Sequence, residues 1–178
     1  QYIDILLKDG KRRSFSLANA PHDDEYLELH ARNYPGGVFT EHVFTNMKVK
    51  DMLRFTGPLG SFFLRDTPEE CSIIFLASGT GFAPIKSILE HVFHQEGGRH
   101  RKRNMTLYWG ARTKSDLYLA DLADKWQREH DNFTFIPVLS EPLPSDNWQG
   151  RTGLVHQAVM HDFLSLEMHQ VYACGVPV

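Results

Sequence analysis

The sequence predicts two folding units, a partial antiparallel β-barrel followed by an open parallel α/β sheet. Short alternating strands with Gly and Pro between them run through the first 66 residues, which is typical of a small barrel. From residue 70 onward, apolar strands alternate with amphipathic helices, which indicates a parallel sheet with helices on both faces. The polar, proline-containing segment 65–70 predicts the boundary, so the expected domains are 1–66 and 70–178.

The first unit reads as a series of short strands. Residues 2–7 alternate in polarity and end at a polar turn, after which 13–17 predict a second strand of a hairpin. The elements expected next are a strand at 25–32, one or two helical turns at 38–44, a strand at 52–55 and a turn at 57–60.

The stretch from Ser72 to Leu89 carries the strongest local signal. A continuous apolar run at 73–77 predicts a strand buried on both faces, and a helix of period 3.6 follows from Phe82, with Pro84 in its first turn. The glycine turn between them would present backbone N–H groups and a helix N-terminus to an anion, so we expect a nucleotide pyrophosphate at 79–81. Pro84 replaces the third glycine of G-x-G-x-x-G, and a tight βα turn with nothing bound stays open as the alternative.

The second unit continues with strands and helices in alternation. The expected elements are a strand at 105–109, a helix around 119–126 capped by Ser115 and Asp116, a strand at 133–139, a Pro-rich loop at 141–149, a short helix near 154–160 and a strand at 171–174.

Composition narrows the function classes. The 178 residues carry a net charge of −3, and a basic cluster at 99–103 lacks the aromatic platform of a nucleic-acid site, so we expect no nucleic-acid partner. No apolar stretch reaches membrane-spanning length and no signal peptide is visible. Two cysteines indicate no disulfide framework, which fits a reducing, cytoplasmic location. They also cannot supply the four ligands of a [2Fe–2S] cluster, which would have to lie in a missing domain or a partner.

Two further features complete this reading. The chain starts with Gln1 directly in a strand-like sequence and stops just past another, so we expect a piece of a longer protein. His91 and His94 lie three apart on a predicted helix, a spacing that allows metal ligation. No third ligand is near in sequence, so surface histidines are the better account and we expect no metal.

Four separated motifs occur in one order. They are Arg13-Ser14-Phe15-Ser16, Pro35-Gly36-Gly37-Val38-Phe39-Thr40, Ser78-Gly79-Thr80-Gly81-Phe82-Ala83-Pro84 and Ala173-Cys174-Gly175-Val176-Pro177. Over its whole length the chain resembles the ferredoxin–NADP reductase superfamily, and within it the oxygenase-reductase and CDP-6-deoxy-3,4-glucoseen reductase branch. The resemblance implies a flavin-binding barrel followed by a pyridine-nucleotide domain, with FAD and NAD(P)H as cofactors.

On the flavin side the resemblance assigns roles to the first two motifs. Arg13 would pair with the cofactor's diphosphate, Phe15 would pack on the flavin ring without the hydroxyl of the family's frequent Tyr, and Ser16 would place its hydroxyl at N5. Ordinary strand positions for Arg13 and Ser16 and a barrel-core role for Phe15 are the alternatives. The remaining flavin contacts implied are Ser14, His30, Ala31, Arg32, Gly36, Gly37, Val38, Phe39 and Thr40, a simple Pro-Gly-Gly turn being the alternative for the second motif.

On the nucleotide side the implied contacts lie at the carboxyl ends of the strands. They are Gly79, Thr80, Gly81, Pro84, Gly110, Arg112, Cys174 and Gly175, with Cys174 beside the nicotinamide. Arg112 and Lys114 could meet a 2′-phosphate, so the choice between NADH and NADPH stays open. A solvated loop arginine and a buried structural thiol are the alternatives for Arg112 and Cys174.

The function implied is hydride transfer from NAD(P)H to bound FAD, with Ser16 and Cys174 as the residues at the reacting atoms. Single electrons would then pass to an iron–sulfur centre or an oxygenase-type partner. A nucleotide-binding or partner-docking fragment without activity of its own, and a reductase of free flavin, are the alternatives. All of this requires that Ser16 and Cys174 meet across one cleft.

Overall fold

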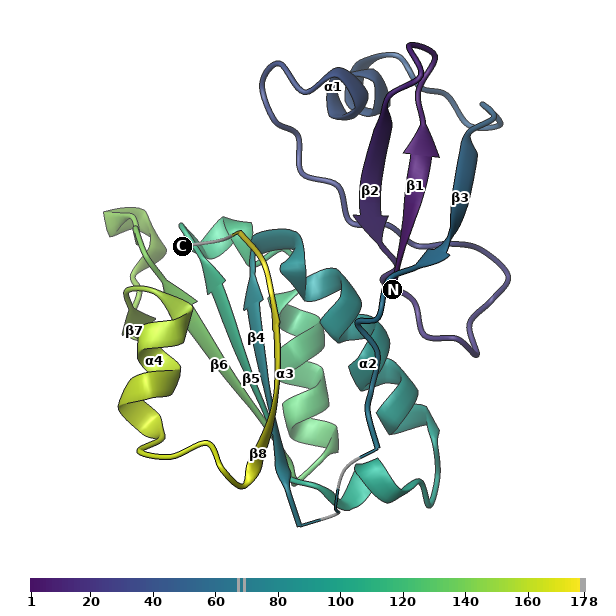
Figure 1. The fold of residues 1–178 in the computed structure, drawn as a ribbon. Coiled ribbons are helices and arrows are strands. Elements are labelled where there is room, and N and C mark those ends of the chain that lie inside the picture. The colour runs from purple at the N-terminus through teal and green to yellow at the C-terminus, as the bar shows by residue number, and fades with distance from the viewer. Residues whose placement is uncertain (67, 69, 177–178) are drawn as a thin grey trace.

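The computed structural model describes residues 1–66, 68 and 70–176, and Figure 1 shows two units joined by a single crossing of the chain near residue 66. The first contains a three-stranded antiparallel sheet and the second a five-stranded parallel sheet. Among the described residues the first sheet stays open, so the expected barrel is present as an antiparallel segment and not as a closed barrel.

The antiparallel sheet has the order β2-β1-β3 and packs on one short helix. Its elements are β1 (Tyr2–Leu6), β2 (Arg12–Ser16), α1 (Val38–Thr45) and β3 (Arg54–Leu59). Ile3 and Ile5 point to the same face of β1 and are buried against Phe39 of α1. This small core confirms the predicted hairpin and the predicted helical turns.

Two expectations for this unit were wrong. Residues 25–32 form no strand, only an isolated bridge between Leu17 and Leu29, because the Asn19 side chain takes the backbone partners that a ladder would use. The turn expected at 57–60 lies largely inside β3, where a Cβ on Gly57 would stand 3.2 Å from the Ile3 Cα. Glycine there permits a close approach of β3 to β1 and does not end the strand.

The parallel sheet has the order β7-β6-β5-β4-β8. Its strands are β4 (Ser72–Ser78), β5 (Met105–Ala111), β6 (Phe133–Leu139), β7 (Arg151–Thr152) and β8 (His169–Cys174). Its helices are α2 (Phe82–His94), α3 (Ala120–Glu129) and α4 (Val155–Asp162), with short 3₁₀ turns at Gly79–Gly81, Arg99–Lys102, Lys114–Asp116 and Pro144–Asp146.

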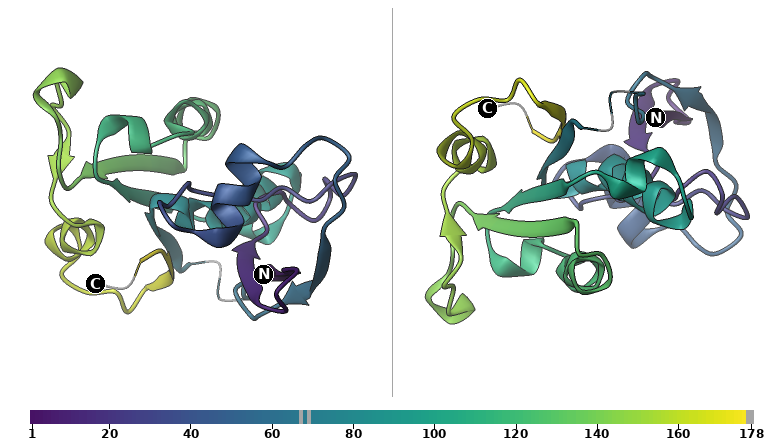
Figure 2. Two further views of the ribbon diagram at one scale, coloured as in Figure 1. Left: turned by 90° about the horizontal axis from the view of Figure 1, so that it is seen from above. Right: turned by 90° about the horizontal axis from the view of Figure 1, so that it is seen from below.

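Helices cover both faces of this sheet, as Figure 2 shows for α3 and α4. Phe75 and Trp109 pack under α2 and α3, whereas Ile74 and Tyr108 pack under α4. Central strands buried on both sides explain why β4 reads as a continuous apolar run.

The cap expected for α3 was also wrong. Ser115 and Asp116 belong to the preceding 3₁₀ turn, and α3 begins at Ala120. The Asp116 carboxylate accepts from the backbone N–H of Thr113 at 3.3 Å, so it closes its own turn.

Two of the sequence-based predictions concern residues that are partly outside the described part of the chain. The predicted boundary 65–70 includes Thr67 and Glu69, and the fourth motif includes Pro177, none of which is described. Arg65, at the start of that boundary, donates its backbone N–H to the Tyr172 hydroxyl at 2.7 Å and so meets the parallel sheet.

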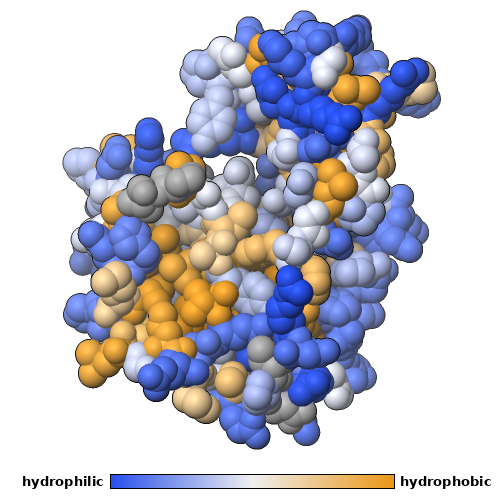
Figure 3. Space-filling view, viewed as in Figure 1, coloured by the Kyte–Doolittle hydropathy of each residue, from blue (hydrophilic) through white to orange (hydrophobic). Residues whose placement is uncertain are grey.

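The surface differs between the two units (Figure 3). Hydrophilic groups cover much of the antiparallel unit, whereas apolar side chains gather over α4 and β8, where Met160, Leu164 and Val171 are exposed. None of the described helices combines the length and the apolar character needed to cross a membrane.

Candidate cofactor cleft

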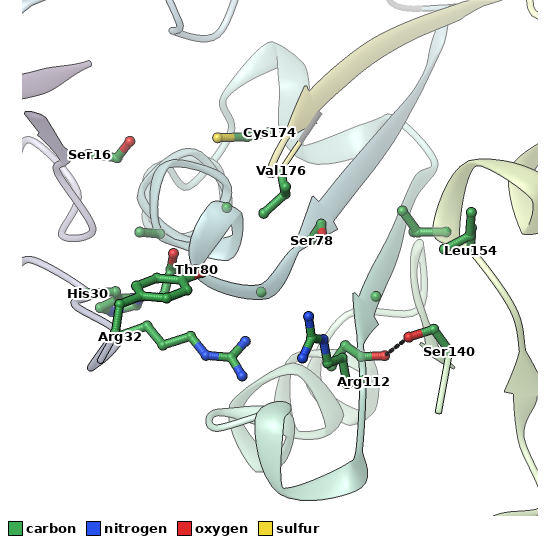
Figure 4. Close-up of a pocket in the computed structure, with 18 of the residues that line it drawn as sticks. Ser16, His30, Arg32, Ser78, Thr80, Arg112, Ser140, Leu154, Cys174 and Val176 are labelled. Carbon is green, nitrogen blue, oxygen red and sulfur yellow. Dashed lines mark hydrogen bonds between the residues drawn. The ribbon is translucent and has the colours of Figure 1, made fainter. Parts of the chain in front are cut away.

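A cleft of about 730 Å³ lies between the two units, above the carboxyl ends of the parallel strands (Figure 4). Both units line it. The predicted residues that it brings together are Ser14, Phe15, Ser16, His30, Arg32 and Thr40 from the first unit and Gly79, Thr80, Gly81, Gly110, Arg112, Cys174 and Gly175 from the second.

Strand register sets the order of groups along the cleft. Ala77 of β4 pairs with Cys174 of β8 on one side and with Trp109 of β5 on the other. Gly110 pairs in turn with Val138 of β6. Neighbouring strands lie about 4.8 Å apart, so the edge from Cys174 to β6 spans about 14 Å. An extended ligand can therefore lie along the edge and touch the ends of β8, β4, β5 and β6.

The turn between β4 and α2 has the form of an anion cradle. Gly79 has φ +53°, and nothing lies within 4 Å of the place where its Cβ would be. Its carbonyl accepts from the Trp109 indole N–H at 3.0 Å, and Trp109 stacks on Phe82 with ring centroids 3.9 Å apart. The first N–H groups of a helix have no partner within it, so this fixed turn can bind phosphate oxygens.

Gly81 has a different part in the same turn. A Cβ there would overlap the Cys174 carbonyl group and approach the Gly175 Cα to 2.8 Å. The glycine therefore lets the start of α2 pack directly on the end of β8. Pro84 is buried in the first turn of α2 and does not line the cleft, so its contribution is to helix packing.

Ser16 and Cys174 approach the cleft from opposite units. Figure 4 shows the Ser16 hydroxyl and the Cys174 sulfur projecting into the same space. Burial raises the pKa of the Cys174 thiol, so it stays neutral at ordinary pH. Both residues thus line one cleft, as the sequence-based account requires.

The rest of the first flavin motif is divided between cleft and surface. Phe15 lines the cleft and lies 5.3 Å from the Phe39 ring, while the Ser14 hydroxyl donates to Asp4 at 2.6 Å. Arg13 is exposed, does not line the cleft and donates to the carbonyl of Arg12 at 2.8 Å.

The second flavin motif forms the start of α1. Gly36 has φ +76°, and the Thr40 hydroxyl donates to the Gly37 carbonyl at 3.2 Å. Of this motif only Thr40 lines the cleft; Gly36, Gly37 and Val38 do not, and Phe39 lies in the core of the antiparallel unit.

Residues 30–32 form the wall beside the glycine turn. His30 lies between the Tyr118 hydroxyl, 2.6 Å from Nδ1, and Glu28, 2.8 Å from Nε2. Arg32 pairs with Asp116 at 3.3 Å. Ala31 lines a smaller adjoining pocket of about 340 Å³ together with Tyr118.

Several cleft residues were not foreseen. They are Tyr34, Ser78, Ala83, Ala111, Ser140, Glu141, Gly153, Leu154, Val155, His156 and Val176, with Tyr118 in the adjoining pocket. The rule that ligands sit at carboxyl ends would have found Ser140 and Glu141, which follow β6 directly. Leu154 and His156 follow β7, whose two residues carry no strand signal. Lys114 does not line the cleft, whereas Arg112 does and lies 4.0 Å from Glu141.

The two histidines of α2 lie beside the ring of His22. His94 stacks on His22 with ring centroids 3.7 Å apart. Within the described ranges, no group of three or more His, Cys, Asp or Glu side chains is placed to hold a metal ion.

Residues of both units line the one cleft, and each unit matches a family model. Residues 1–64 match the oxidoreductase FAD-binding domain, and residues 75–178 match the oxidoreductase NAD-binding domain. The chain therefore belongs to the FAD- and NAD-binding reductases of the ferredoxin–NADP reductase superfamily, which confirms the resemblance seen in its motifs.

Two curated relatives and one solved structure are consistent with this family. The chain is 41% identical to the CDP-6-deoxy-L-threo-D-glycero-4-hexulose-3-dehydrase reductase of Yersinia pestis, over 98% of this chain and 50% of that protein. It is 39% identical to reductase component 2 of a terephthalate 1,2-dioxygenase from Comamonas, over 99% of this chain and 51% of that protein. The Amycolatopsis cytochrome P450 reductase GcoB has a similar structure, with a TM-score of 0.85, 34% identity and coverage of 97% and 51%. The chain spans about half the length of the curated relatives it matches.

Proposed function

We propose that the protein carrying this chain is an NAD(P)H-dependent flavoprotein reductase that uses bound FAD and delivers electrons to another protein. The observation that carries the proposal is the position of Ser16 and Cys174, which come from different units and project into one cleft. Hydride transfer requires the two cofactors to be in contact, so they would meet at the cleft that both units line.

The residues of the nucleotide side fit a dinucleotide. Gly79 leaves open space where any other residue would place a Cβ, which is the room that a pyrophosphate needs. Thr80 and Gly81 would supply N–H groups to it, and the neighbouring ends of β8 and β5 would hold the nicotinamide and the adenosine.

The residues of the flavin side fit a second phosphate-bearing cofactor. Gly36 and Gly37 precede α1, and the Gly37 N–H donates to the Tyr34 carbonyl at 2.9 Å, so the first N–H groups of α1 itself would bind a diphosphate, with Thr40 beside them at the cleft. Arg32 would supply a cation at the cleft and Phe15 an aromatic face for the ring, whereas the exposed Arg13 side chain lies outside the cleft and would have to turn toward the diphosphate to pair with it.

When bound, the nicotinamide supplies a hydride and the flavin accepts it and releases electrons singly. The Ser16 hydroxyl would donate a hydrogen bond at the flavin N5. The Cys174 thiol, neutral because burial raises its pKa, would pack on the nicotinamide and keep water from the junction. Hydride transfer requires no acid–base pair from the chain, because its rate depends on the orientation of the two rings.

The partner follows from the kind of relatives found. They are named as reductases of a dehydrase, of a dioxygenase and of a cytochrome P450. We therefore propose an enzyme or iron–sulfur protein as electron acceptor. Cys71 and Cys174 are both free thiols, which fits a reducing, cytoplasmic setting.

The test is anaerobic mixing of the full-length, FAD-loaded protein with NADH and, separately, with NADPH. The visible absorbance of the flavin should bleach with at least one donor within a single turnover. Flavin that stays oxidised with both donors refutes the proposal.

A second candidate is a nucleotide-binding module without activity of its own. The open three-stranded sheet of the described residues favours it, because an antiparallel unit with two free edges has less surface to hold a flavin. The visible spectrum of the purified chain decides between them: a yellow protein excludes the module, and a colourless one that still binds ADP-ribose supports it.

A further inference from the structure

One buried lysine of the second unit forms hydrogen bonds to the first unit. Lys86 lies on the second turn of α2, and only 7% of its surface is exposed. Its ammonium donates to the carbonyl of Ala18 at 3.3 Å and to the Glu28 carboxylate at 2.9 Å, both in the first unit. The third donor reaches Glu90 on α2 itself at 2.9 Å. An ammonium has three N–H groups, so all of them are used.

The partners of Lys86 belong to a loop that is internally tied. This loop, residues 17–30 and hereafter the docking loop, follows β2 and ends at His30. The Ala18 N–H donates to the Glu28 carbonyl at 2.9 Å, and the Glu28 N–H donates to the Asn19 side chain at 3.0 Å. The Ser87 hydroxyl of α2 adds a third hydrogen bond from this helix to the loop, at the Asn19 carbonyl, 2.8 Å away. The docking loop is therefore tied to α2 through both Lys86 and Ser87.

The same network reaches the wall of the cleft. Glu28 uses one oxygen for Lys86 and the other for His30 Nε2, at 2.8 Å. A carboxylate only accepts, so Nε2 carries a proton and, in a neutral ring, Nδ1 accepts from the Tyr118 hydroxyl at 2.6 Å. His30 lines the cleft and Tyr118 belongs to the second unit, so the network crosses between the units a second time.

Electrostatics keep this network charged. Burial would lower the pKa of Lys86, but hydrogen bonds to Glu28 and Glu90 outweigh it and raise that pKa. Burial would raise the pKa of Glu28, but hydrogen bonds from Lys86 and His30 lower it. Glu90 is different, because burial raises its pKa despite the bond from Lys86. The pair that joins the two units is thus the one whose carboxylate is held ionised by its partners.

Lys86 lies close to both cofactor-binding elements along the chain. Lys86 is the fifth residue after Gly81, about 7.5 Å along the axis of α2. Ala18 is the second residue after Ser16, at most about 7 Å away. Loss of the Lys86 bonds would therefore release the segment that leads to Ser16, whereas the first turn of α2, with Phe82 and Ile85 buried in the core of the parallel unit, would keep the glycine turn in place.

We propose that Lys86 is a positioning residue, which clamps the docking loop to α2 and thereby sets the alignment of Ser16 with Cys174. This inference rests on the proposed function for the cofactors that are aligned. Misplacing reacting groups by about 1 Å can cost about 10²-fold in rate, so the clamp acts on the rate of hydride transfer and not on nucleotide affinity.

The test compares Lys86→Met with wild type in the full-length, FAD-loaded protein. Flavin reduction at saturating nucleotide should slow by about tenfold or more, while the Kd for ADP-ribose changes by less than about twofold, because the glycine turn is untouched. Hydrogen exchange at the Ala18 and Glu28 amides should accelerate by about tenfold, with β4 and β5 unchanged. Lys86→Arg keeps the charge and N–H donors for Glu28, so it should reduce the flavin faster than Lys86→Met, though below the wild-type rate because the larger guanidinium fits the buried site less well.

Lys125→Met is the matched control, since Lys125 forms an exposed i,i+4 pair with Glu129 on α3. It should leave every readout as in wild type. If Lys86→Met does not fold, Glu28→Gln, which keeps the shape and removes one charge, is judged by the same criteria.

The outcomes separate the two proposals. Unchanged exchange in the docking loop, or an unchanged reduction rate, overturns the clamp. A parallel fall in affinity and rate also overturns it, since that pattern reports general disruption and not positioning. A wild-type flavin that no nicotinamide reduces sinks the proposed function instead, and the exchange data then still decide whether Lys86 holds the docking loop.

Discussion

The glycine turn offers the sharpest quantitative prediction, because its two glycines are there for different reasons. At Gly81 the backbone angle is ordinary, with φ −59°, so an alanine costs nothing in conformation. Its Cβ would nevertheless stand 2.5 Å from the Cys174 carbonyl carbon and 2.8 Å from the Gly175 Cα. Both contacts are with backbone atoms, which cannot rotate away from the added methyl group as a side chain could. Overpacking of this kind costs about 2–3 kcal/mol, which we expect as the loss in unfolding free energy for Gly81→Ala.

Gly79→Ala should behave in the opposite way. With φ +53° an alanine is strained by about 1 kcal/mol, but no atom lies within 4 Å of its Cβ. The added methyl instead takes up open space beside the pyrophosphate site, so affinity for ADP-ribose should fall by about tenfold or more.

Urea denaturation and calorimetric titration with ADP-ribose measure the two effects. Gly97→Ala is the matched control: its φ is +77° and its Cβ would also meet nothing, but it does not line the cleft. It should show the same strain as Gly79→Ala and wild-type affinity. A Gly81→Ala protein as stable as wild type, or a Gly79→Ala protein with wild-type affinity, would refute the division of roles.

Three further predictions concern single side chains. Trp109 is fully buried and donates to the Gly79 carbonyl, so Trp109→Phe should lower the unfolding free energy measured in urea by about 2–3 kcal/mol. The control is Trp148→Phe, because the Trp148 indole donates to the Arg151 carbonyl at a half-buried site. A smaller loss of unfolding free energy for Trp109→Phe than for Trp148→Phe would contradict this prediction. Burial raises the pKa of Cys174, so in a Cys71→Ser background iodoacetamide should alkylate it more slowly than free cysteine at neutral pH and faster as the pH rises; alkylation as fast as free cysteine would be inconsistent with that burial. Burial lowers the pKa values of His91, His100 and His130 from 6.5. The unfolded state therefore binds more protons than the folded state, and the unfolding free energy should fall as the pH drops below 6.5. An unfolding free energy that stays constant through that pH range would contradict this prediction.

Local chemistry made the parallel unit predictable from sequence. β4 is buried on both faces, which leaves a continuous apolar run, and β6 was expected at the residues where it is found. The antiparallel unit was harder. Residues 25–32 alternate like a strand, but Asn19 binds their backbone through its side chain, and no pattern within 25–32 reveals a partner six residues before them.

The cleft residues also divide into those that could be predicted from the sequence and those that could not. Glycine turns and strand ends are local signals, and they led to Gly79, Gly81 and Cys174. Tyr118 and Lys86 carry no such signal, because their roles depend on His30 and Glu28, more than fifty residues away in the sequence. Contacts that join two units are a property of the fold, so a single sequence read along its length does not disclose them.

The most direct test of the central claim is single-turnover, anaerobic reduction of the flavin in Ser16→Ala, Cys174→Ala and the double variant, each at saturating nucleotide. If the two residues flank one junction, each single substitution should slow reduction by about tenfold or more, and the double variant should be slower than either without a change in flavin content. A double variant that reduces its flavin at the wild-type rate would contradict the account.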